Sequence, residues 1–305
     1  MFAAYQYNSY AVHFIDGKIY GTYWKISSTK YIDVDTQGKI KQMLNDIDLV
    51  ASNYNPNSEL SKINRLNISE TIQISKELNL LIEASEHINY QTNGLFNITL
   101  GIQTSKMGFG PNIDSSLIEI NNKLMRELYD LEDFLLTKNY LFHFDLSAIA
   151  KGYAVDEISA LLLENGYTDF VLDIGGELAV QGKKHNEQWT IAIQDPNSEQ
   201  QQPIYLINSH APYYLATSGE YRNYYYDEAG QLITHTIDPR TNKSIKGSNL
   251  SVTIKNDHSA MFADAYATAL NIMDIDEGLK FANANNLQVM YISKDNNYFS
   301  NNWND

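Results

Sequence analysis

The sequence contains no cysteine among its 305 residues. A chain without thiols cannot form disulfides, thiolate metal sites or iron–sulfur clusters, and it cannot use a cysteine nucleophile. It also has few basic residues, since 22 Lys and Arg stand against 37 Asp and Glu and give a formal net charge of −15. Binding of nucleic acid needs clustered basic side chains, so this charge argues against a nucleic-acid partner.

Long apolar runs are missing as well. No stretch approaches 18 consecutive apolar residues, so the sequence predicts no segment that spans a membrane. The first ten residues, MFAAYQYNSY, lack a basic segment followed by an apolar one and do not match a signal peptide. Two alternatives remain open: a cytoplasmic protein, or an exported protein whose targeting segment was removed.

Several common catalytic motifs are also absent. The sequence has no GxxxxGK[ST] phosphate loop, no GxGxxG after a strand, no HExxH and no GxSxG. Its seven histidines do not show metal-ligand spacing. The usual routes to nucleotide hydrolysis, nicotinamide binding, zinc proteolysis and serine esterase chemistry therefore find no support.

What is present predicts a folded chain, because 43% of the residues are hydrophobic and 12% are aromatic. Helical spacing and strand alternation do not follow a strict βαβ order, so we expect an α+β fold. We expect one integrated unit over 1–305, with two lobes and a site in the cleft between them. In this unit 1–18 form an N-terminal extension and 295–305 a tail. The expected helices are 33–54, 58–63, 75–92, 149–165, 260–273 and 275–285, and the main expected strands are 19–27, 140–146, 170–174, 178–180, 190–193, 214–218, 223–226, 249–254 and 288–292.

The segment DLSAIAK, residues 145–151, predicts a strand end, a turn of small residues and a helix start with Lys151 on its first turn. Amides at a helix start point outward and can bind an anion. The alternative is an ordinary turn in which Ser147 caps the helix.

A second pattern is Asp264 and Thr268, which stand four residues apart and share a helix face. A carboxylate and a hydroxyl are hard oxygen donors. Together with a backbone carbonyl and phosphate oxygens they would complete an octahedral Mg²⁺ site. The alternative is a helix whose threonine bonds back to a carbonyl.

Two further patterns carry chemistry. His235 precedes an Asp-Pro turn, and the unperturbed pKa of histidine lies near neutrality, so it is a candidate base; the alternative is a structural histidine. The segment LDIGGE, residues 172–177, runs from a strand into two glycines, which indicates either close approach of a ligand or a tight bend.

Taken together and in this order, these segments resemble the ApbE family of FAD:protein FMN transferases. The matching strings cover nearly the whole chain: YNPNSELS (54–61), GLFNIT with GFGP (94–111), DLSAIAKGYAVD (145–156), LDIGGE (172–177), ATSGEYR (216–222), HTIDPRT (235–241) and ADAYATAL (263–270).

The resemblance implies an enzyme that binds FAD and Mg²⁺, transfers FMN to a Thr or Ser hydroxyl of an acceptor flavoprotein, and releases AMP. Two alternatives share its residues: an FAD pyrophosphatase that yields FMN and AMP, and a flavin-binding protein without turnover. Family members are often periplasmic lipoproteins, so the resemblance also implies an exported, lipid-anchored form. A cytoplasmic location remains the alternative.

The resemblance also assigns residues. It implies metal ligation by the carbonyl of Ala148 and the side chains of Asp264 and Thr268. It makes His235, Asp264 and Lys151 the catalytic residues, with His235 as base and Lys151 neutralising charge as AMP departs. The implied FAD contacts are Tyr20, Tyr54, Leu95, Phe96, Asn97, Asp145, Lys151 and Ile237.

Two positions depart from the family pattern. Tyr20 stands where the family usually has Met before Gly-Thr, and Asn97 stands where it usually has Asp. The second change removes a negative charge and adds an amide donor beside the expected cofactor.

Overall fold

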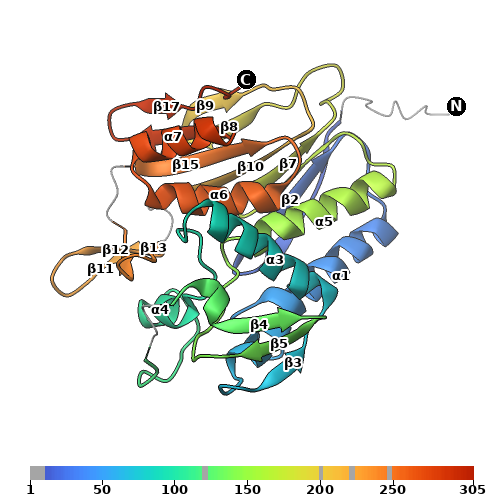
Figure 1. Ribbon diagram of the computed structural model, residues 1–305. Helices are drawn as coiled ribbons and strands as arrows, with labels where there is room; N and C mark the ends of the chain where they lie inside the picture. Colours follow the sequence, from blue (N-terminus) through green and yellow to red (C-terminus); the bar gives the residue numbers. More distant parts are fainter. Residues whose placement is uncertain (1–10, 119–122, 199–201, 220–223, 246–248) are drawn as a thin grey trace, which may run out of the picture.

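The computed structural model describes residues 11–118, 123–198, 202–219, 224–245 and 249–305. Parts of two predicted features lie outside these ranges: residues 220–222 of the ATSGEYR string, and residue 223 of the strand expected at 223–226. The predicted α+β fold is confirmed (Figure 1).

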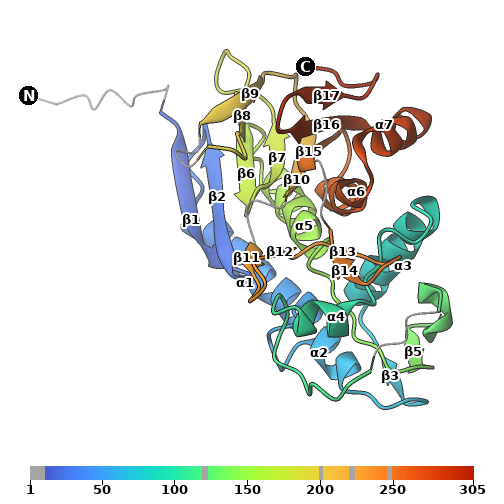
Figure 2. The ribbon, with the colours of Figure 1, turned by 90° about the vertical axis from the view of Figure 1, so that its left-hand side faces the viewer.

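An eight-stranded antiparallel sheet forms the large lobe (Figures 1 and 2). In β2, exposed or half-buried residues alternate with buried ones, because one face of the strand packs against helices. The order across the sheet is β1 (His13–Ile19), β2 (Thr22–Ser28), β6 (Phe170–Ile174), β7 (Glu177–Gln181), β10 (Tyr213–Gly219), β15 (Asn249–Asn256), β16 (Gln288–Ser293) and β17 (Asn297–Phe299).

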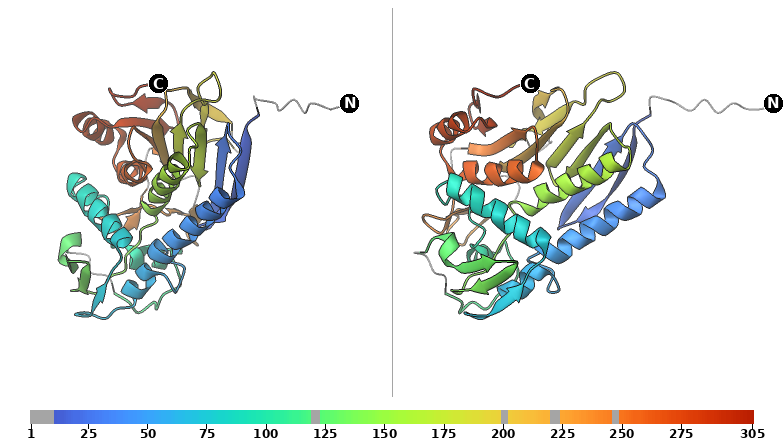
Figure 3. Two further views of the ribbon diagram at one scale, coloured as in Figure 1. Left: turned by 90° about the vertical axis from the view of Figure 1, so that its right-hand side faces the viewer. Right: turned by 45° about the vertical axis from the view of Figure 1, so that its right-hand side comes forward.

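Helices α5 (Ala150–Glu164) and α6 (Ala260–Ile272) lie side by side across one face of this sheet (Figures 1 and 3). Helix α1 (Val34–Ala51) packs against α5, and α3 (Lys76–Gln91) contacts both α1 and α6. Helix α6 is rich in alanine, and its inner residues are almost fully buried, which allows the close contact with α5 and with β10 and β15. Helix α7 (Ile275–Ala284) packs against β16.

The small lobe lies below the sheet in Figure 1. It contains α2 (Glu59–Asn64), α4 (Gly101–Lys106), a short 3₁₀ helix (Met125–Glu127) and a three-stranded sheet in the order β3 (Thr71–Gln73), β5 (Leu135–Lys138), β4 (Tyr129–Glu132).

Shorter hairpins complete the described chain. Strands β8 (Ile191–Gln194) and β9 (Pro203–Ile207) pair near the C-terminal strand, while β13 (Ile237–Asp238) pairs with β14 (Lys243–Ser244). Strand β11 (Tyr224–Tyr226) pairs with β12 (Leu232–Thr234), and this hairpin lies between the sheet and α4 (Figures 1 and 2).

The strand expected at 140–146 is wrong. Within this segment only His143 forms a bridge, a parallel one with Leu100. The side chain of Asn64 takes the place of a neighbouring strand, since its Oδ1 accepts from the amide of Phe144 at 2.7 Å and its Nδ2 donates to the carbonyl of Phe144 at 3.0 Å. The amide and the carbonyl of Phe144 are therefore hydrogen-bonded without a neighbouring strand.

The strand expected at 19–27 also differs, because a turn interrupts it. Tyr20 and Gly21 have φ of 52° and 72° and join β1 to β2, with Ile19 opposite Thr22. Positive φ at both central residues is the pattern of a type I′ hairpin. Consequently β1 uses residues assigned to the expected N-terminal extension, and β17 uses residues assigned to the expected tail.

Among the helices that the structure describes, none has both the length and the apolar character needed to cross a bilayer.

Candidate functional site

A cavity of about 980 Å³ lies where the two lobes meet. Residues of the sheet, of α5 and α6, and of the loops around α1, α2 and α4 line it. All the residues singled out from the sequence are among those that line it: Tyr20, Tyr54, Leu95, Phe96, Asn97, Asp145, Ala148, Lys151, His235, Ile237, Asp264 and Thr268. The structure thus brings them together, while their individual roles stay predictions.

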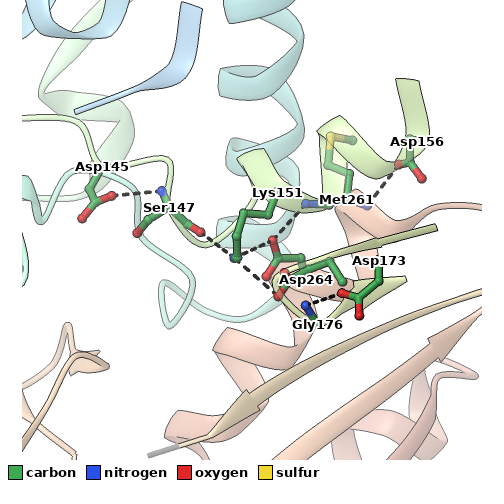
Figure 4. A network of polar contacts seen from close by, with 10 residues as sticks. Asp145, Ser147, Lys151, Asp156, Asp173, Gly176, Met261 and Asp264 are labelled. Atoms are coloured by element: carbon green, nitrogen blue, oxygen red, sulfur yellow. Dashed lines mark hydrogen bonds and ion pairs between the residues drawn. The ribbon is translucent and has the colours of Figure 1, made fainter. Parts of the chain in front are cut away.

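Asp264 lies on the second turn of α6 and is only 5% exposed. Its Oδ2 accepts a hydrogen bond from the amide of Gly152 at 3.1 Å and lies 3.5 Å from Nζ of Lys151 (Figure 4). A buried carboxylate needs such partners, because burial without them is costly. Both partners come from α5, so the two helices together hold this carboxylate.

Thr268 lies one turn further along α6 and is half-buried in the cavity wall. The alternative drawn from the sequence, in which the Thr268 hydroxyl bonds back to a helix carbonyl, does not hold. Within the described ranges, the Thr268 hydroxyl forms no hydrogen bond, unlike Thr92 in the small lobe, whose Oγ1 donates to the carbonyl of Ile88 at 2.7 Å. The Thr268 oxygen is therefore available to a ligand in the cavity.

Lys151 lies between two buried carboxylates. Its Nζ is 3.4 Å from Oε1 of Glu177 and 3.5 Å from Oδ2 of Asp264, and it donates to the carbonyl of Ser147 at 3.2 Å (Figure 4). Burial lowers the pKa of Lys151, but the charges of Asp264 and Glu177 outweigh it, so the pKa lies above its usual value. The ammonium therefore stays charged at neutral pH.

The start of α5 is not capped by Ser147, contrary to the alternative drawn from the sequence. The N-cap residue is Ile149, which offers no side-chain hydrogen bond. Instead, Oδ1 of Asp145 accepts from the amide of Ser147 at 3.0 Å and shapes the turn (Figure 4). This turn presents Ala148 to the cavity.

Glu177 is a cavity residue that the sequence reasoning did not single out. It is 3% exposed, begins β7 and faces the cavity. Gly175 and Gly176 have φ of 66° and 105° and turn β6 directly into β7, so the tight bend is real and places Glu177 beside Lys151. The sequence feature that could have indicated Glu177 is its place at the end of the LDIGGE string, directly after the two glycines.

Neutral groups also line the cavity. The hydroxyl of Tyr54 donates to the carbonyl of Phe109 at 2.7 Å, and burial, followed by the charge of Asp145, raises the pKa of Tyr54. Leu95 and Phe96 are 5% and 1% exposed. Their side chains are thus mostly enclosed, while the segment itself borders the cavity.

The two positions that depart from the family pattern have defined partners. Oδ1 of Asn97 accepts from the amide and the hydroxyl of Thr99 at 2.9 and 2.7 Å. This fixes the oxygen of the carboxamide and leaves the nitrogen as the donor toward other groups. The hydroxyl of Tyr20 donates to the carbonyl of Leu44 in α1 at 2.8 Å, and burial raises the pKa of Tyr20 well above its usual range.

His235 lies between β12 and β13 and is half-buried in the cavity wall. Its ring contacts Phe109 edge-on, with 6.2 Å between centroids. Asp238, which follows in the same string, binds the guanidinium of Arg240 at 2.9 Å. The Asp-Pro-Arg turn is thus closed by its own ion pair, and Ile237 beside it is buried.

The donor set fits a magnesium ion that is shared with a substrate. Asp264 and Thr268 offer a carboxylate and a hydroxyl, and the turn at Ala148 offers a carbonyl, all in one cavity. In the described part of the chain, His, Asp and Glu do not form any group of three that would hold a metal. Mg²⁺ commonly takes one or two carboxylates plus substrate phosphates, so phosphate oxygens must complete such a site here.

Comparison with known proteins identifies the family. The model of the ApbE family matches residues 20–291. The FAD:protein FMN transferase of Vibrio cholerae is 32% identical over 272 residues, covering 86% of this chain and 80% of that protein. The enzyme of the same name from Escherichia coli is 28% identical, covering 93% and 85%.

Solved structures give the same result. The flavin transferase ApbE from Vibrio cholerae superimposes with a TM-score of 0.84 at 29% identity, covering 96% of this chain and 99% of that one. The family match, the relatives and the shared fold together establish that this chain belongs to the ApbE family.

Proposed function

We propose that this ApbE-family protein is a Mg²⁺-dependent FAD:protein FMN transferase, which moves FMN from FAD to a Thr or Ser hydroxyl of an acceptor flavoprotein. One observation carries the proposal: a single cavity gathers the hard oxygen donors of α6, the charged Lys151 and the ring of His235. Curated relatives over most of the chain bear the same activity in their names.

The reaction is a phosphoryl-type displacement. The acceptor hydroxyl oxygen bonds to the FMN-side phosphorus, the bond from that phosphorus to the bridging oxygen breaks, AMP leaves, and a ring nitrogen of His235 accepts the hydroxyl proton. Mg²⁺, when held by Ala148, Asp264 and Thr268, would polarise the phosphoryl oxygens. Most of the catalytic effect in such a reaction comes from positioning and charge stabilisation.

Lys151 stabilises the leaving group. Its ammonium is kept charged by Asp264 and Glu177, so it can offset the negative charge that develops on AMP. The two carboxylates also hold the ammonium in place, because it lies within 3.5 Å of each. Because the protein has a net charge of −15, an anionic dinucleotide would bind through Mg²⁺, Lys151 and helix-end amides and not through a basic patch.

We also propose, from the family resemblance, that the full-length protein is exported and lipid-anchored on the periplasmic side. A lipid-bearing cysteine would have to lie outside these 305 residues, since they contain none. Fractionation of cells that express the natural gene tests this: recovery in the cytoplasmic fraction would contradict it.

The activity is tested by incubating the protein with FAD, MgCl₂ and a candidate acceptor flavoprotein. We expect a fluorescent flavin band on the acceptor in a denaturing gel, together with AMP, and loss of both with EDTA. AMP without a covalent flavin would indicate an FAD pyrophosphatase. A stoichiometric FAD complex that releases no AMP with any acceptor would indicate a flavin-binding protein.

A further inference from the structure

The metal donors of the proposed site come from two separate elements. Ala148 lies in the turn that leads into α5, whereas Asp264 and Thr268 lie on α6. Whether the three oxygens converge therefore depends on how α5 and α6 are placed against each other. Two contacts between these helices, one made by Asp156 and one at Gly152, fix that placement.

The first contact is made by Asp156, on the second turn of α5. Its Oδ1 accepts from the amide of Ala260 at 2.6 Å, and its Oδ2 accepts from the hydroxyl of Ser259 at 2.6 Å. The same Oδ2 accepts from the amide of Met261 at 3.0 Å (Figure 4). Ser259 itself accepts from the amide of Phe262 at 3.2 Å. All three amides at the start of α6 are thus satisfied, two of them by a carboxylate of another helix.

The second contact is the close approach at Gly152, one turn earlier on the same face of α5. A Cβ at this position would lie 2.4 Å from the carbonyl oxygen of Ala260 and 2.6 Å from Cα of Met261. Because glycine has no side chain, its amide reaches Oδ2 of Asp264 at 3.1 Å. The first turn of α6 is therefore held at two points along α5.

Burial disfavours the charged form of the Asp156 carboxylate. Burial raises the pKa of Asp156 to about 6, even though the hydrogen bonds from Ser259, Ala260 and Met261 lower it. Capping of α6 alone does not require a buried charge, because Ser259 already caps this helix. A bond between two helices, in contrast, does require a group that reaches across from α5.

We infer that Asp156 is a positioning residue for the metal site: it locks the start of α6 onto α5, so that Asp264 and Thr268 converge with the carbonyl of Ala148. This inference rests on the proposed Mg²⁺-dependent function. Asp156 acts through the helix and does not line the cavity. Partners that orient metal ligands typically contribute 10–100-fold to metal affinity or activity.

The test compares Asp156→Asn with the control Asp274→Asn. Asp274 also caps a helix, since its Oδ1 accepts from the amide of Glu277 at 2.8 Å, but it caps α7, away from the cavity. Binding of Mn²⁺ to each protein with FAD, and without acceptor, is measured by electron paramagnetic resonance of the free ion. We expect the Kd for Mn²⁺ to rise roughly 10–100-fold in Asp156→Asn and to stay at the wild-type value in Asp274→Asn.

Two further readouts separate positioning from general loss of stability. Hydrogen exchange at the amides of Ala260 and Met261 should be faster in Asp156→Asn, and raised Mg²⁺ should restore its turnover. If this variant does not fold, Ser259→Ala removes only one of the three donors to Asp156, and we expect a smaller rise in Kd, of a few fold.

If a folded Asp156→Asn protein binds Mn²⁺ with the wild-type Kd, the inference is wrong, while the proposed metal role stands. If Asp156→Asn does not fold, a wild-type Kd in Ser259→Ala leads to the same conclusion. Absence of Mn²⁺ binding by the wild-type protein with FAD would overturn the proposed metal role and the inference together.

Discussion

Two groups of residues that line the cavity differ in charge and in construction. The charged wall, formed by Lys151, Glu177 and Asp264, comes from α5, α6 and the end of the sheet. The neutral wall, formed by Tyr54, Leu95, Phe96, Asn97 and Phe109, comes from loops of the small lobe and the segment after α1. The charged wall is held by ion pairs between regular elements, the neutral wall by bonds from side chains to loop backbone such as Tyr54 to Phe109.

This difference indicates a division of labour. Charge stabilisation in a transition state depends steeply on the position of each group, so rigid elements suit the charged wall. Recognition of a large ligand is spread over many contacts, each worth little, so loops suffice for the neutral wall. Substitutions in the charged wall should therefore lower turnover strongly, and those in the neutral wall should mainly weaken FAD binding.

The largest effect is expected for Asp264→Ala in the charged wall. It removes the only carboxylate among the proposed metal donors, so we expect Mg²⁺-dependent flavin transfer to fall on the order of 10³-fold. The rate of covalent flavin formation at saturating FAD measures this. Circular dichroism controls for folding, and full activity in a folded variant would refute the metal assignment.

His235→Gln should have the next largest effect. Loss of a general base costs about 10²-fold or more, so transfer to the acceptor should slow by that factor while FAD affinity changes less than about twofold. Stopped-flow flavin transfer and FAD titration measure the two quantities separately. An unchanged transfer rate would assign the base to another group.

Tyr54→Phe tests the neutral wall. It removes one hydrogen bond, to the carbonyl of Phe109, worth about 1 kcal/mol, so we expect KM for FAD to rise roughly fivefold with kcat nearly unchanged. Steady-state kinetics with varied FAD measures both constants. A large loss of turnover at saturating FAD, with KM unchanged, would mean that the division between the two walls is wrong.

The smallest effect on catalysis is expected at His143, in the segment that leads from the small lobe to α5. Burial, and then the charge of Lys138, lowers the pKa of His143 to about 4. An unfolded chain, with its histidine titrating near 6.5, therefore binds more protons than the folded one between these values. The free energy of unfolding should fall as the pH drops from about 6.5 to 4.

Urea unfolding across this pH range measures the effect, with His143→Gln as the comparison. The glutamine variant should lose less stability than the wild type between the two pH values, with turnover at neutral pH unchanged. Parallel pH dependences in the two proteins would contradict the assignment to His143.

The residues singled out from the sequence line one cavity, whereas two of the expected elements around them differ in the structure. The site residues stand in short strings at the ends of elements, where a few neighbours determine both turn and chemistry, as in Asp145 to Lys151. The strand at 140–146 was wrong because its backbone bonds to separate, distant partners: Phe144 to the side chain of Asn64, and Asp145 to the carbonyl of Ile98. No local pattern reveals such a partner.

The same limit explains what was missed in the site. Glu177 belongs to a recognised string, but its pairing with Lys151 depends on where β7 ends relative to α5. Likewise the turn at Tyr20 interrupts an alternation that continues on both sides, so periodicity alone cannot place it.

The wide spacing of the cavity residues along the chain has a consequence for biosynthesis. The cavity combines Tyr20 with Thr268, and β2 finds its partner in β6 only after the small lobe has been made. Contacts between such distant residues form late in folding, because the intervening chain must first be ordered. An emerging chain therefore cannot form the complete cavity until α6 has been made.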